Sequence, residues 1–454
     1  MNASPTPHAP TTTGIAVIGA GAAGLAAASS LHEAGVEFAV LDARDRIGGR
    51  VFTHRDPLTG IPIELGAEFI HGRAGDLETV LRAAGLRSIE VDGPRWTASR
   101  GRLRKADDFW DRLDRVLGRL KPRGNDESFQ SFLDRRPGGP RLASDRRLAR
   151  QYVQGFHAAD PRLISVQALT ADGSPGDDVR EQRIGRVLGG YDRVTAWLAA
   201  PFPHRVRLGA VVTRVEWEPG AVRVHVSDAA GRAPAVVEAR AAIVTVPLGV
   251  LRAAPGEAGV IEFDPALRDK EQALAALASG SVVRVAFRFQ ERFWASESLA
   301  RKAGTEELDT LSFLHTSDDD FAVWWTAHPM RVSVAVAWCG GPRARRLARL
   351  SPEAIQDRAA ASLARQMGLP PGRVHRLIDG MWMHDWEHDP FARGAYSYQA
   401  VGGAEAPASL ARPLRRTLFF AGEAADPGGR TGTVHGAIAT GRRAAEEVLR
   451  ALRR

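Results

Sequence analysis

A glycine-rich turn near the start of the chain constrains its fold more than any other feature. The run 15–19 (IAVIG) is continuously apolar, as a buried parallel strand should be. The motif 19–24 (GAGAAG) follows at once, and the pattern predicts a helix over 22–34. A second strand over 37–41 ends at Asp42. A strand, a glycine turn, a helix, a strand and an acid in this order predict a Rossmann-type dinucleotide site.

Each glycine of the turn has a separate task at such a site. Gly19 permits the tight turn, Gly21 lets the backbone approach a pyrophosphate, and Gly24 lets the helix pack on the strand. The helix N-terminus offers N–H groups and a partial positive charge to the phosphates. Asp42 is placed to accept hydrogen bonds from a ribose. The motif alone does not separate NAD from FAD.

Composition excludes several classes of protein. A hydrophobic fraction of 44% and a charged fraction of 25% are ordinary globular values, which excludes a mainly disordered chain, a collagen and a coiled coil. The net charge of +8 is spread over 454 residues without a basic and aromatic stripe, so we expect no nucleic-acid partner. A single cysteine, Cys339, excludes an internal disulfide and a cysteine-ligated metal, and we expect no metal site. We also expect a disordered tail over 1–13, no membrane segment and a cytoplasmic location.

Further motifs follow in a fixed order. They are 48–50 (GGR), 64–72 (ELGAEFIHG), 154–161 (QGFHAADP), 418–423 (LFFAGE) and 432–437 (GTVHGA). Together they resemble the FAD-dependent amine oxidase family, which includes monoamine and polyamine oxidases, over about residues 14 to 450. The resemblance implies an α/β fold: an FAD-binding, Rossmann-like (doubly wound) domain and a mixed α+β substrate domain.

Carried over by position, the resemblance implies how the cofactor is held. Arg50 should lie against the phosphates or the flavin, where a guanidinium offsets phosphate charge. Gly66 and Ala67 are small enough for backbone to lie against the ring, and the backbone of Val212 should meet the adenine. Glu423 should touch the ribityl chain or the ribose. The full cofactor-binding set is Gly19, Gly21, Ala23, Gly24, Asp42, Ala43, Gly49, Arg50, Gly66, Ala67, Glu68, Val212, Gly422, Glu423, Thr433 and Val434.

On the substrate side, the resemblance implies a pair of side chains that flank the amine before the flavin. Tyr396 matches the first and Thr433 the second, so at most half of an aromatic sandwich is present. Trp386 should pack beside the ring. Some family members attach the flavin to a cysteine at the position of Ala395, and we therefore expect non-covalent FAD. The alternative for Tyr396 and Trp386 is ordinary core packing.

Three further residues carry the specificity predictions. Arg284 stands where many members have a lysine that holds a water near flavin N5; it either takes over that positioning role or is a solvent-facing residue on a half-exposed strand. His71 resembles a histidine that meets the polyamine in animal-type polyamine oxidases. Glu68 adds a carboxylate for a distal ammonium. For His71 and Glu68 the alternative is packing or helix capping.

The predicted organisation is interleaved. The FAD domain takes 14–75, 204–262 and 410–454, and the substrate domain takes 76–203 and 263–409. Helices are predicted over 76–85, 105–120, 352–367 and 432–452, and strands over 206–215, 222–226, 241–246, 281–289, 321–326 and 331–339. The helix over 105–120 is expected to be a surface helix with a solvated face.

The resemblance implies an enzyme that oxidises a primary or secondary amine, a monoamine or a polyamine. Hydride transfer to flavin N5 would give an imine and then an aldehyde, with oxygen as the acceptor and hydrogen peroxide as a product. The catalytic candidates are Tyr396, Arg284, Thr433, Trp386 and His71. The alternatives are a flavin desaturase or protoporphyrinogen-type oxidase acting on a C–C bond, and a non-catalytic FAD-binding protein.

Overall fold

The structure is a computed structural model of the chain. It describes residues 11–72, 74–99, 101–121, 124–171, 183–305, 307–316 and 320–453. Most of the predicted tail lies outside these residues. Its last part differs from the prediction, because Thr11–Thr12 form a short strand, β1, that pairs in parallel with β14 (Ala235–Ala239).

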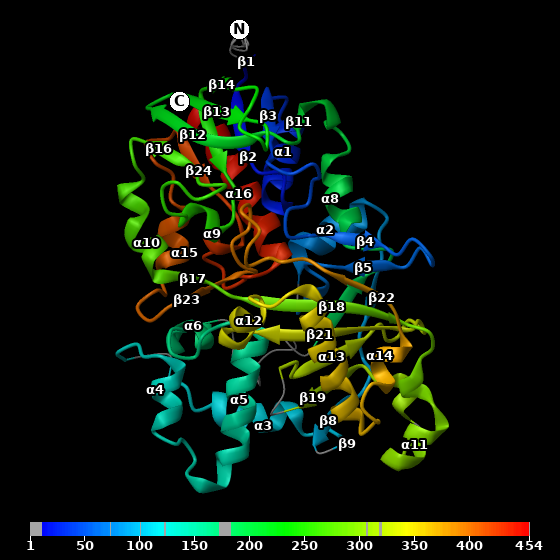
Figure 1. The fold of residues 1–454 in the computed structure, drawn as a ribbon. Coiled ribbons are helices and arrows are strands. Elements are labelled where there is room, and N and C mark those ends of the chain that lie inside the picture. The colour runs from blue at the N-terminus through cyan, green and yellow to red at the C-terminus, as the bar shows by residue number, and fades with distance from the viewer. Residues whose placement is uncertain are drawn as a thin grey trace.

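A five-stranded parallel sheet forms the core of one lobe, drawn at the top of Figure 1. Its order is β11-β3-β2-β15-β24, so β2, the strand that leads into the glycine turn, lies at its centre. The strands are β2 (Ile15–Ile18), β3 (Phe38–Leu41), β11 (Val206–Arg207), β15 (Ala241–Val244) and β24 (Leu418–Phe420). Segments far apart in the sequence therefore build one sheet.

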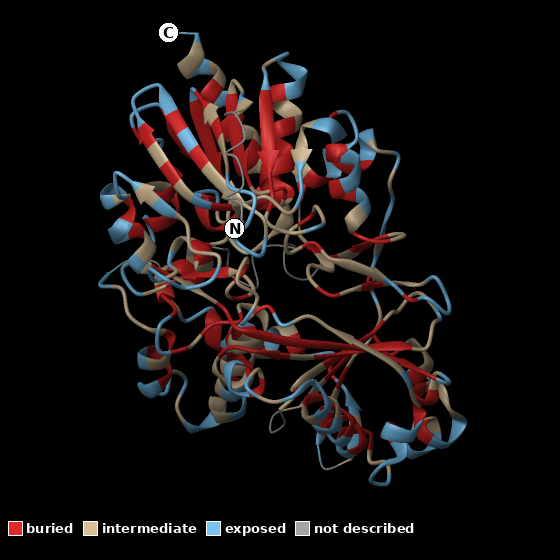
Figure 2. Cartoon of the chain, turned by 45° about the horizontal axis from the view of Figure 1, so that its top comes forward, coloured by how far each residue is buried: buried red, intermediate tan, exposed pale blue. Residues whose placement is uncertain are grey.

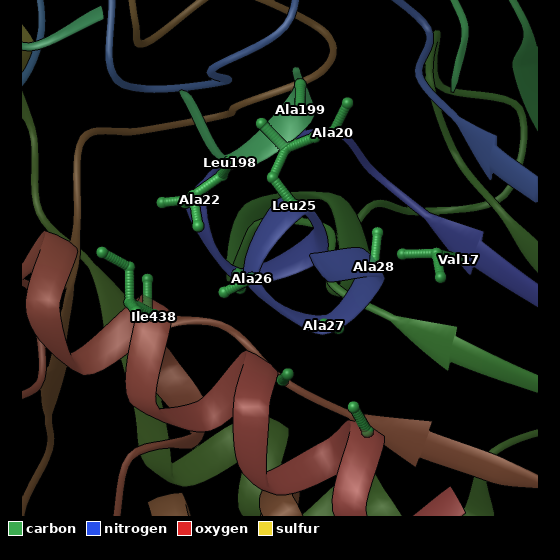
Figure 3. Packing of buried hydrophobic residues seen from close by; sticks show 14 of the residues in the cluster. Val17, Ala20, Ala22, Leu25, Ala26, Ala27, Ala28, Leu198, Ala199 and Ile438 are labelled. Atoms are coloured by element: carbon green, nitrogen blue, oxygen red, sulfur yellow. The ribbon is translucent and has the colours of Figure 1, made fainter. Parts of the chain in front are cut away.

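Two long helices cover one face of this sheet. α1 (Ala22–Glu33) is the helix after the glycine turn, and α16 (Val434–Leu452) is the last helix of the chain. Figure 3 shows Ile438 of α16 lying beneath the alanines of α1. The helices approach so closely that a Cβ on Gly441 would lie 2.1 Å from the Ala23 carbonyl oxygen. Small residues are needed here because two backbones meet.

A second sheet packs on the other face, in the order β1-β14-β13-β12-β16. Its longer strands are β12 (Val211–Glu218) and β13 (Ala221–Ser227), with β16 (Glu262–Asp264) at the edge. Alternate residues such as Val215 and Val224 are buried against the parallel sheet, which is the period-two pattern of a half-buried strand.

The other lobe is organised by a seven-stranded sheet in the order β22-β18-β21-β20-β19-β8-β9 (Figure 1). Its strands are β8 (Arg95–Ser99), β9 (Arg102–Lys105), β18 (Val282–Phe289), β19 (Phe313–Thr316), β20 (Val323–Thr326), β21 (Val334–Gly340) and β22 (Ile378–Met383). α13 (Pro352–Met367) covers one face and begins and ends as predicted: Ser351 caps its N-terminus and Gly368 is left-handed. Figure 2 shows buried residues concentrated in the parallel sheet and in the seven-stranded sheet.

Two helices that the sequence assigned to the substrate domain pack instead with the parallel-sheet core. α2 (Gly75–Ala83) and α8 (Asp192–Ala199) contribute Leu77 and Leu198 to the cluster that buries α1. A separate helical cluster contains α3 (Phe109–Leu117), α4 (Phe129–Asp134), α5 (Ala143–Phe156) and α6 (Val166–Ala171).

The other elements include β4 (Thr53–Arg55), β5 (Pro62–Glu64), β6 (Phe69–His71), β7 (Ser88–Glu90), β10 (Ile184–Val187), α9 (Leu248–Leu251), α10 (Glu271–Ala276), β17 (Leu277–Ser279), α11 (Glu297–Ala303), α12 (Pro342–Leu347), α14 (Arg373–Leu377), β23 (Ser397–Gln399) and α15 (Ala406–Ala411).

Candidate active site

A cavity of about 660 Å³ lies between the carboxyl ends of the parallel strands and the seven-stranded sheet. Ligands of open parallel sheets bind at this edge. The predicted residues that line the cavity are Gly19, Gly21, Ala23, Asp42, Ala43, Gly49, Arg50, Gly66, Ala67, His71, Val212, Arg284, Trp386, Tyr396, Gly422, Glu423, Thr433 and Val434. Two predicted residues, Gly24 and Glu68, are not part of its walls.

The glycine turn contains one closely packed glycine and one glycine that faces open space. A Cβ on Gly24 would lie 1.9 Å from the Gly19 carbonyl oxygen, so this position is closed by the packing of helix on strand. A Cβ on Gly21 would meet a protein atom only at 4.0 Å, the Gly48 carbonyl oxygen, so this position opens into the cavity. The N-terminus of α1 has no side-chain cap and no acid in its first turn. These free N–H groups beside an open cradle fit a pyrophosphate.

Asp42 stands at the end of β3, buried in the wall of the cavity. Its carboxylate accepts hydrogen bonds from the backbone N–H of Ala20 at 2.7 Å and of Arg44 at 2.9 Å. Burial raises the pKa of Asp42, while these two N–H groups act in the opposite direction. Each carboxylate oxygen has a second lone pair, so the carboxylate can also receive ribose hydroxyls.

Arg50 and Glu423 form an ion pair in the wall, with Nη1 and Oε1 2.8 Å apart. The same Nη1 donates to the Ala395 carbonyl oxygen at 2.7 Å. The other oxygen of Glu423 accepts from the Ser397 hydroxyl at 2.6 Å and from the Gly432 N–H at 2.9 Å. Three segments distant in sequence are thereby tied together, and Arg50 is held at the cavity rather than in a surface salt bridge.

Gly66 lines the cavity, and the packing around it leaves no room for a side chain. A Cβ there would lie 1.9 Å from the Arg50 carbonyl oxygen and 3.3 Å from the Trp386 ring. The indole N–H of Trp386 donates to the Leu65 carbonyl oxygen at 2.8 Å, which fixes the buried ring beside Gly66. The wall at Gly66 therefore consists of backbone and one flat ring.

Tyr396 and Thr433 both line the cavity, but their hydroxyl groups are engaged with protein. The Tyr396 hydroxyl donates to the Phe156 carbonyl oxygen at 2.6 Å, and burial raises its pKa above the ordinary value. The Thr433 hydroxyl caps α16 by accepting from the Gly436 N–H at 3.0 Å. Tyr396 thus presents its ring to the cavity and is not an acid or a base near neutral pH.

Arg284 is buried, which contradicts the alternative of a solvent-facing strand residue. All of β18 is buried, because both faces of this strand are covered. The guanidinium of Arg284 pairs with Glu68 at 2.5 Å, and Arg186 pairs with the other oxygen of Glu68 at 2.6 Å. Burial alone would raise the pKa of Glu68, but the two guanidiniums outweigh it and hold that pKa below its ordinary value. Glu68 is therefore already neutralised by two cations, and the prediction that it receives a distal ammonium is not supported.

At its other end, the cavity is enclosed by a closed ring of eight aromatic side chains, which we call the aromatic collar. Neighbouring rings lie with centroids between 4.7 Å and 6.2 Å apart. In order around the collar they are Phe69, His71, Phe156, Tyr152, Trp110, Phe109, His315 and Phe313. Sequence reasoning found His71 and missed most of the others.

Phe109 and Trp110 correct a second expectation. They begin α3, the helix expected to be a surface helix, and both line the cavity. Two adjacent aromatic residues at the start of the charge-rich segment were the available signal. The exposed residues of α3 do give it a solvated face, so the expectation was incomplete at its N-terminus.

Four histidines line the cavity, and the protein keeps them neutral. Burial lowers the pKa of His71, His157 and His435 to about 4, and that of His315 to about 3. Nδ1 of His71 and Nε2 of His315 have no hydrogen-bond partner among the described residues. The histidines of the chamber thus add no charge to it near neutral pH.

Cys339 lies in β21 and is not among the residues that line the cavity. It is buried, and burial raises its pKa to about 12. Ala395 is the residue at the wall. Among the described residues, no three histidine, cysteine, aspartate or glutamate side chains gather as a metal site would require. Within the same residues, no helix has the length and hydropathy needed to cross a membrane.

Comparison with known proteins agrees with this geometry. The family described as flavin containing amine oxidoreductase matches residues 22–449. Polyamine oxidase 1 of Oryza sativa subsp. japonica is 30% identical, with 96% of each chain covered. Polyamine oxidase 3 of the same species is 29% identical over 95% of this chain and 88% of its own length.

Solved structures share the fold. A putrescine oxidase bound to putrescine has a TM-score of 0.79 at 23% identity, covering 97% of this chain and 100% of that one. Cyclohexylamine oxidase from Brevibacterium oxydans has a TM-score of 0.78 at 22% identity, with the same coverage. The glycine cradle, the uncapped helix and the Arg50–Glu423 pair fit the cofactor of this family. The chain belongs to the flavin-containing amine oxidoreductases and is an FAD-dependent amine oxidoreductase.

Proposed function

We propose that this protein oxidises a primary or secondary amine whose reacting C–N bond lies between Tyr396 and Thr433. When bound, FAD supplies the hydride acceptor, flavin N5, and is reoxidised by oxygen to give hydrogen peroxide. The imine that leaves hydrolyses in water to an aldehyde and an amine or ammonia. The observation that carries this proposal is the single cavity that joins the glycine turn to Tyr396 and the aromatic collar.

In this proposal the residues of the chain bind and orient the cofactor and the amine, and the reaction needs no protein nucleophile. We assign the pyrophosphate to the N-terminus of α1 and to Gly21, and the ribose to Asp42. Arg50, fixed by Glu423, places positive charge beside the cofactor. The ring of Tyr396 forms one side of the amine site, and Trp386 supports the wall at Gly66. The neutral histidines surround the amine with weakly polar side chains. A site that excludes water limits side reactions of the reacting groups.

Arg284 takes a positioning role in this proposal. Its Nη1 lies 3.3 Å from the Gly66 carbonyl oxygen, and its Nε is buried without a partner among the described residues. A guanidinium donates hydrogen bonds but does not give up its proton, so Arg284 can hold a water or oxygen near the flavin without acting as a base.

Names of relatives narrow the substrate only to amines. Polyamine oxidases and a putrescine oxidase are among the similar proteins, and the sequence predicted a monoamine or a polyamine. The engagement of Glu68 by two arginines leaves the polyamine assignment without its predicted carboxylate. A cytoplasmic location and non-covalent FAD remain predictions, and Ala395 at the wall supports the second.

Anaerobic reduction of the bound flavin tests the proposal. Purified holoenzyme is mixed without oxygen with monoamines, polyamines, acetylated polyamines and amino acids, and the loss of flavin absorbance is followed. Reduction by at least one amine, and peroxide formation when oxygen is admitted, are the expected results. A flavin that no amine reduces, but that a substrate with a C–C bond to desaturate does reduce, would replace the proposal with the desaturase alternative.

A further inference from the structure

Arg95 lies at the aromatic collar as the first residue of β8. Its guanidinium carbon lies 5.0 Å from the ring centre of Trp110, 5.1 Å from that of Phe313 and 5.8 Å from that of Phe109. The register of β8 with β19 sets Arg95 directly beside Phe313. Three collar rings therefore lie at cation–π distance from this guanidinium.

Five arginines are found among the described residues that line the cavity, and four of them have a carboxylate partner. Arg44 pairs with Asp389, Arg50 with Glu423, Arg284 with Glu68 and Arg430 with Asp426. Arg95 has none: no described residue forms an ion pair with it or accepts a hydrogen bond from its side chain. Arg95 is half-buried at the chamber, and because a charge partly removed from water is costly unless it is paired, the missing partner is a feature that a ligand can complete.

The carboxylates found among the described residues of the cavity wall are not available to form an ion pair with Arg95. Among the described lining residues they are Asp42 and Glu423, both on the cofactor side and both engaged. Glu68 is held by two other arginines. The described part of the chamber therefore presents an unpaired positive charge, aromatic walls and two ring nitrogens without partners, on His71 and His315.

We infer that Arg95 is a specificity residue that binds a carboxylate carried by the amine substrate. The substrate class is then an amine with an anionic group at the end remote from the reacting C–N bond and an apolar stretch between them. A guanidinium donates two parallel hydrogen bonds to a carboxylate, and the collar rings cover the apolar stretch. A diamine or polyamine would bring a second ammonium to the same cation and be repelled. This inference rests on the proposed function and names its substrate class.

The first test is equilibrium binding and does not depend on turnover. Hexanoate and hexanamide match in shape and differ in charge, and neither has an amine to oxidise. Calorimetry on oxidised holoenzyme should show hexanoate binding about tenfold tighter or more, because one partner of the hydrogen bonds is ionised. Arg95→Gln should remove this preference and Arg95→Lys should keep part of it. Arg104→Gln, on the exposed side of the adjacent strand β9, should change nothing.

The second test uses three amines of one chain length: hexylamine, ω-aminohexanoate and hexamethylenediamine. Anaerobic flavin reduction in the wild type should favour the amino acid over the diamine. Arg95→Gln should lower the apparent affinity for ω-aminohexanoate about tenfold or more, with hexylamine within about threefold. Flavin content and melting temperature confirm that each variant is folded.

The outcomes separate the two claims. Equal binding of hexanoate and hexanamide to the wild type, or a preference for hexanoate that survives Arg95→Gln, overturns the role of Arg95. Faster reduction by the diamine than by the amino acid in the wild type overturns the substrate class. A wild type that no amine reduces contradicts the proposed function, and the hexanoate measurement still decides whether Arg95 binds carboxylates.

Discussion

The two ends of the cavity are built in different ways. The cofactor end consists of backbone and small residues from a few short segments, such as the glycine turn and the stretch around Gly66. The end at the aromatic collar consists of side chains that come from β6, α3, α5 and β19. Backbone cradles leave a motif in the sequence, whereas a collar assembled from several elements leaves only scattered aromatic residues. The cofactor of such a protein is therefore easier to predict from the sequence than the substrate is.

The comparison is tested most strongly within the glycine turn. We expect Gly24→Ala to lower the free energy of unfolding by about 3 kcal/mol or more, because its Cβ would lie 1.9 Å from a backbone oxygen. Gly21→Ala should change apoprotein stability by less than about 0.5 kcal/mol, because its Cβ has open space, and should weaken FAD binding about tenfold or more. Denaturant unfolding of apoprotein and flavin titration measure the two effects. Equal losses of stability in both variants would contradict the division of tasks.

A second prediction concerns the network between the two ends. Arg284→Met leaves Glu68 with one cation, Arg186, and the indole N–H of Trp325, and the free energy of unfolding should fall by about 2–3 kcal/mol. Flavin reoxidation by oxygen should also slow, while anaerobic reduction changes less. Arg284→Lys, which retains the charge, is the matched control and should recover part of both. A normal reoxidation rate in Arg284→Met would remove Arg284 from the oxygen side of the reaction.

Lowering the pH should reduce the stability of the folded protein, because histidines that burial keeps neutral lie at the aromatic collar and beside it. The folded protein keeps His71, His157 and His315 neutral, whereas the unfolded chain protonates them below about pH 6.5. The unfolded state then binds more protons, so stability is full above about pH 6.5 and falls as the pH drops toward 4. Each histidine should contribute on the order of 2 kcal/mol to this loss. Unfolding curves of His315→Phe should show a smaller loss across this range than the wild type; an unchanged pH dependence would argue against a neutral His315.

Of these substitutions, Tyr396→Phe should have the smallest effect on stability and on flavin reduction. Tyr396→Phe keeps the ring and leaves the Phe156 carbonyl oxygen unpaired, so stability should fall by about 1 kcal/mol. Flavin reduction by amines should change by no more than a few fold. Tyr396→Ala removes the ring and should slow reduction while FAD stays bound. Stopped-flow reduction of the two variants checks this order, and unchanged kinetics in Tyr396→Ala would remove Tyr396 from the site.

Local signals predicted much of the fold. α13 was found because Ser351, Pro352 and Gly368 mark its ends, and the strands of the parallel sheet were found because they are continuously apolar. For β18, the structure contradicts one of the two alternatives drawn from the sequence, the half-exposed strand. Its arginines suggest a solvated face, yet Arg284 and Arg288 are buried with Glu68 and Asp56, which are more than two hundred residues away in sequence.

The site divides in the same way. Gly21, Arg50 and Glu423 stand in motifs whose order is informative, and the structure brings them to one cavity. Arg95 gave no signal, since its meaning depends on the absence of an acidic partner among the described residues around it in space. Pairing between distant side chains is the part of the site that local patterns do not encode.

Anaerobic titration of the purified holoenzyme with amines tests the central claim most directly. The account predicts a yellow protein whose flavin absorbance is lost on addition of an amine, with ω-aminohexanoate more effective than hexamethylenediamine, and is restored by oxygen. A protein that binds no FAD, or whose flavin absorbance no amine reduces, would contradict it.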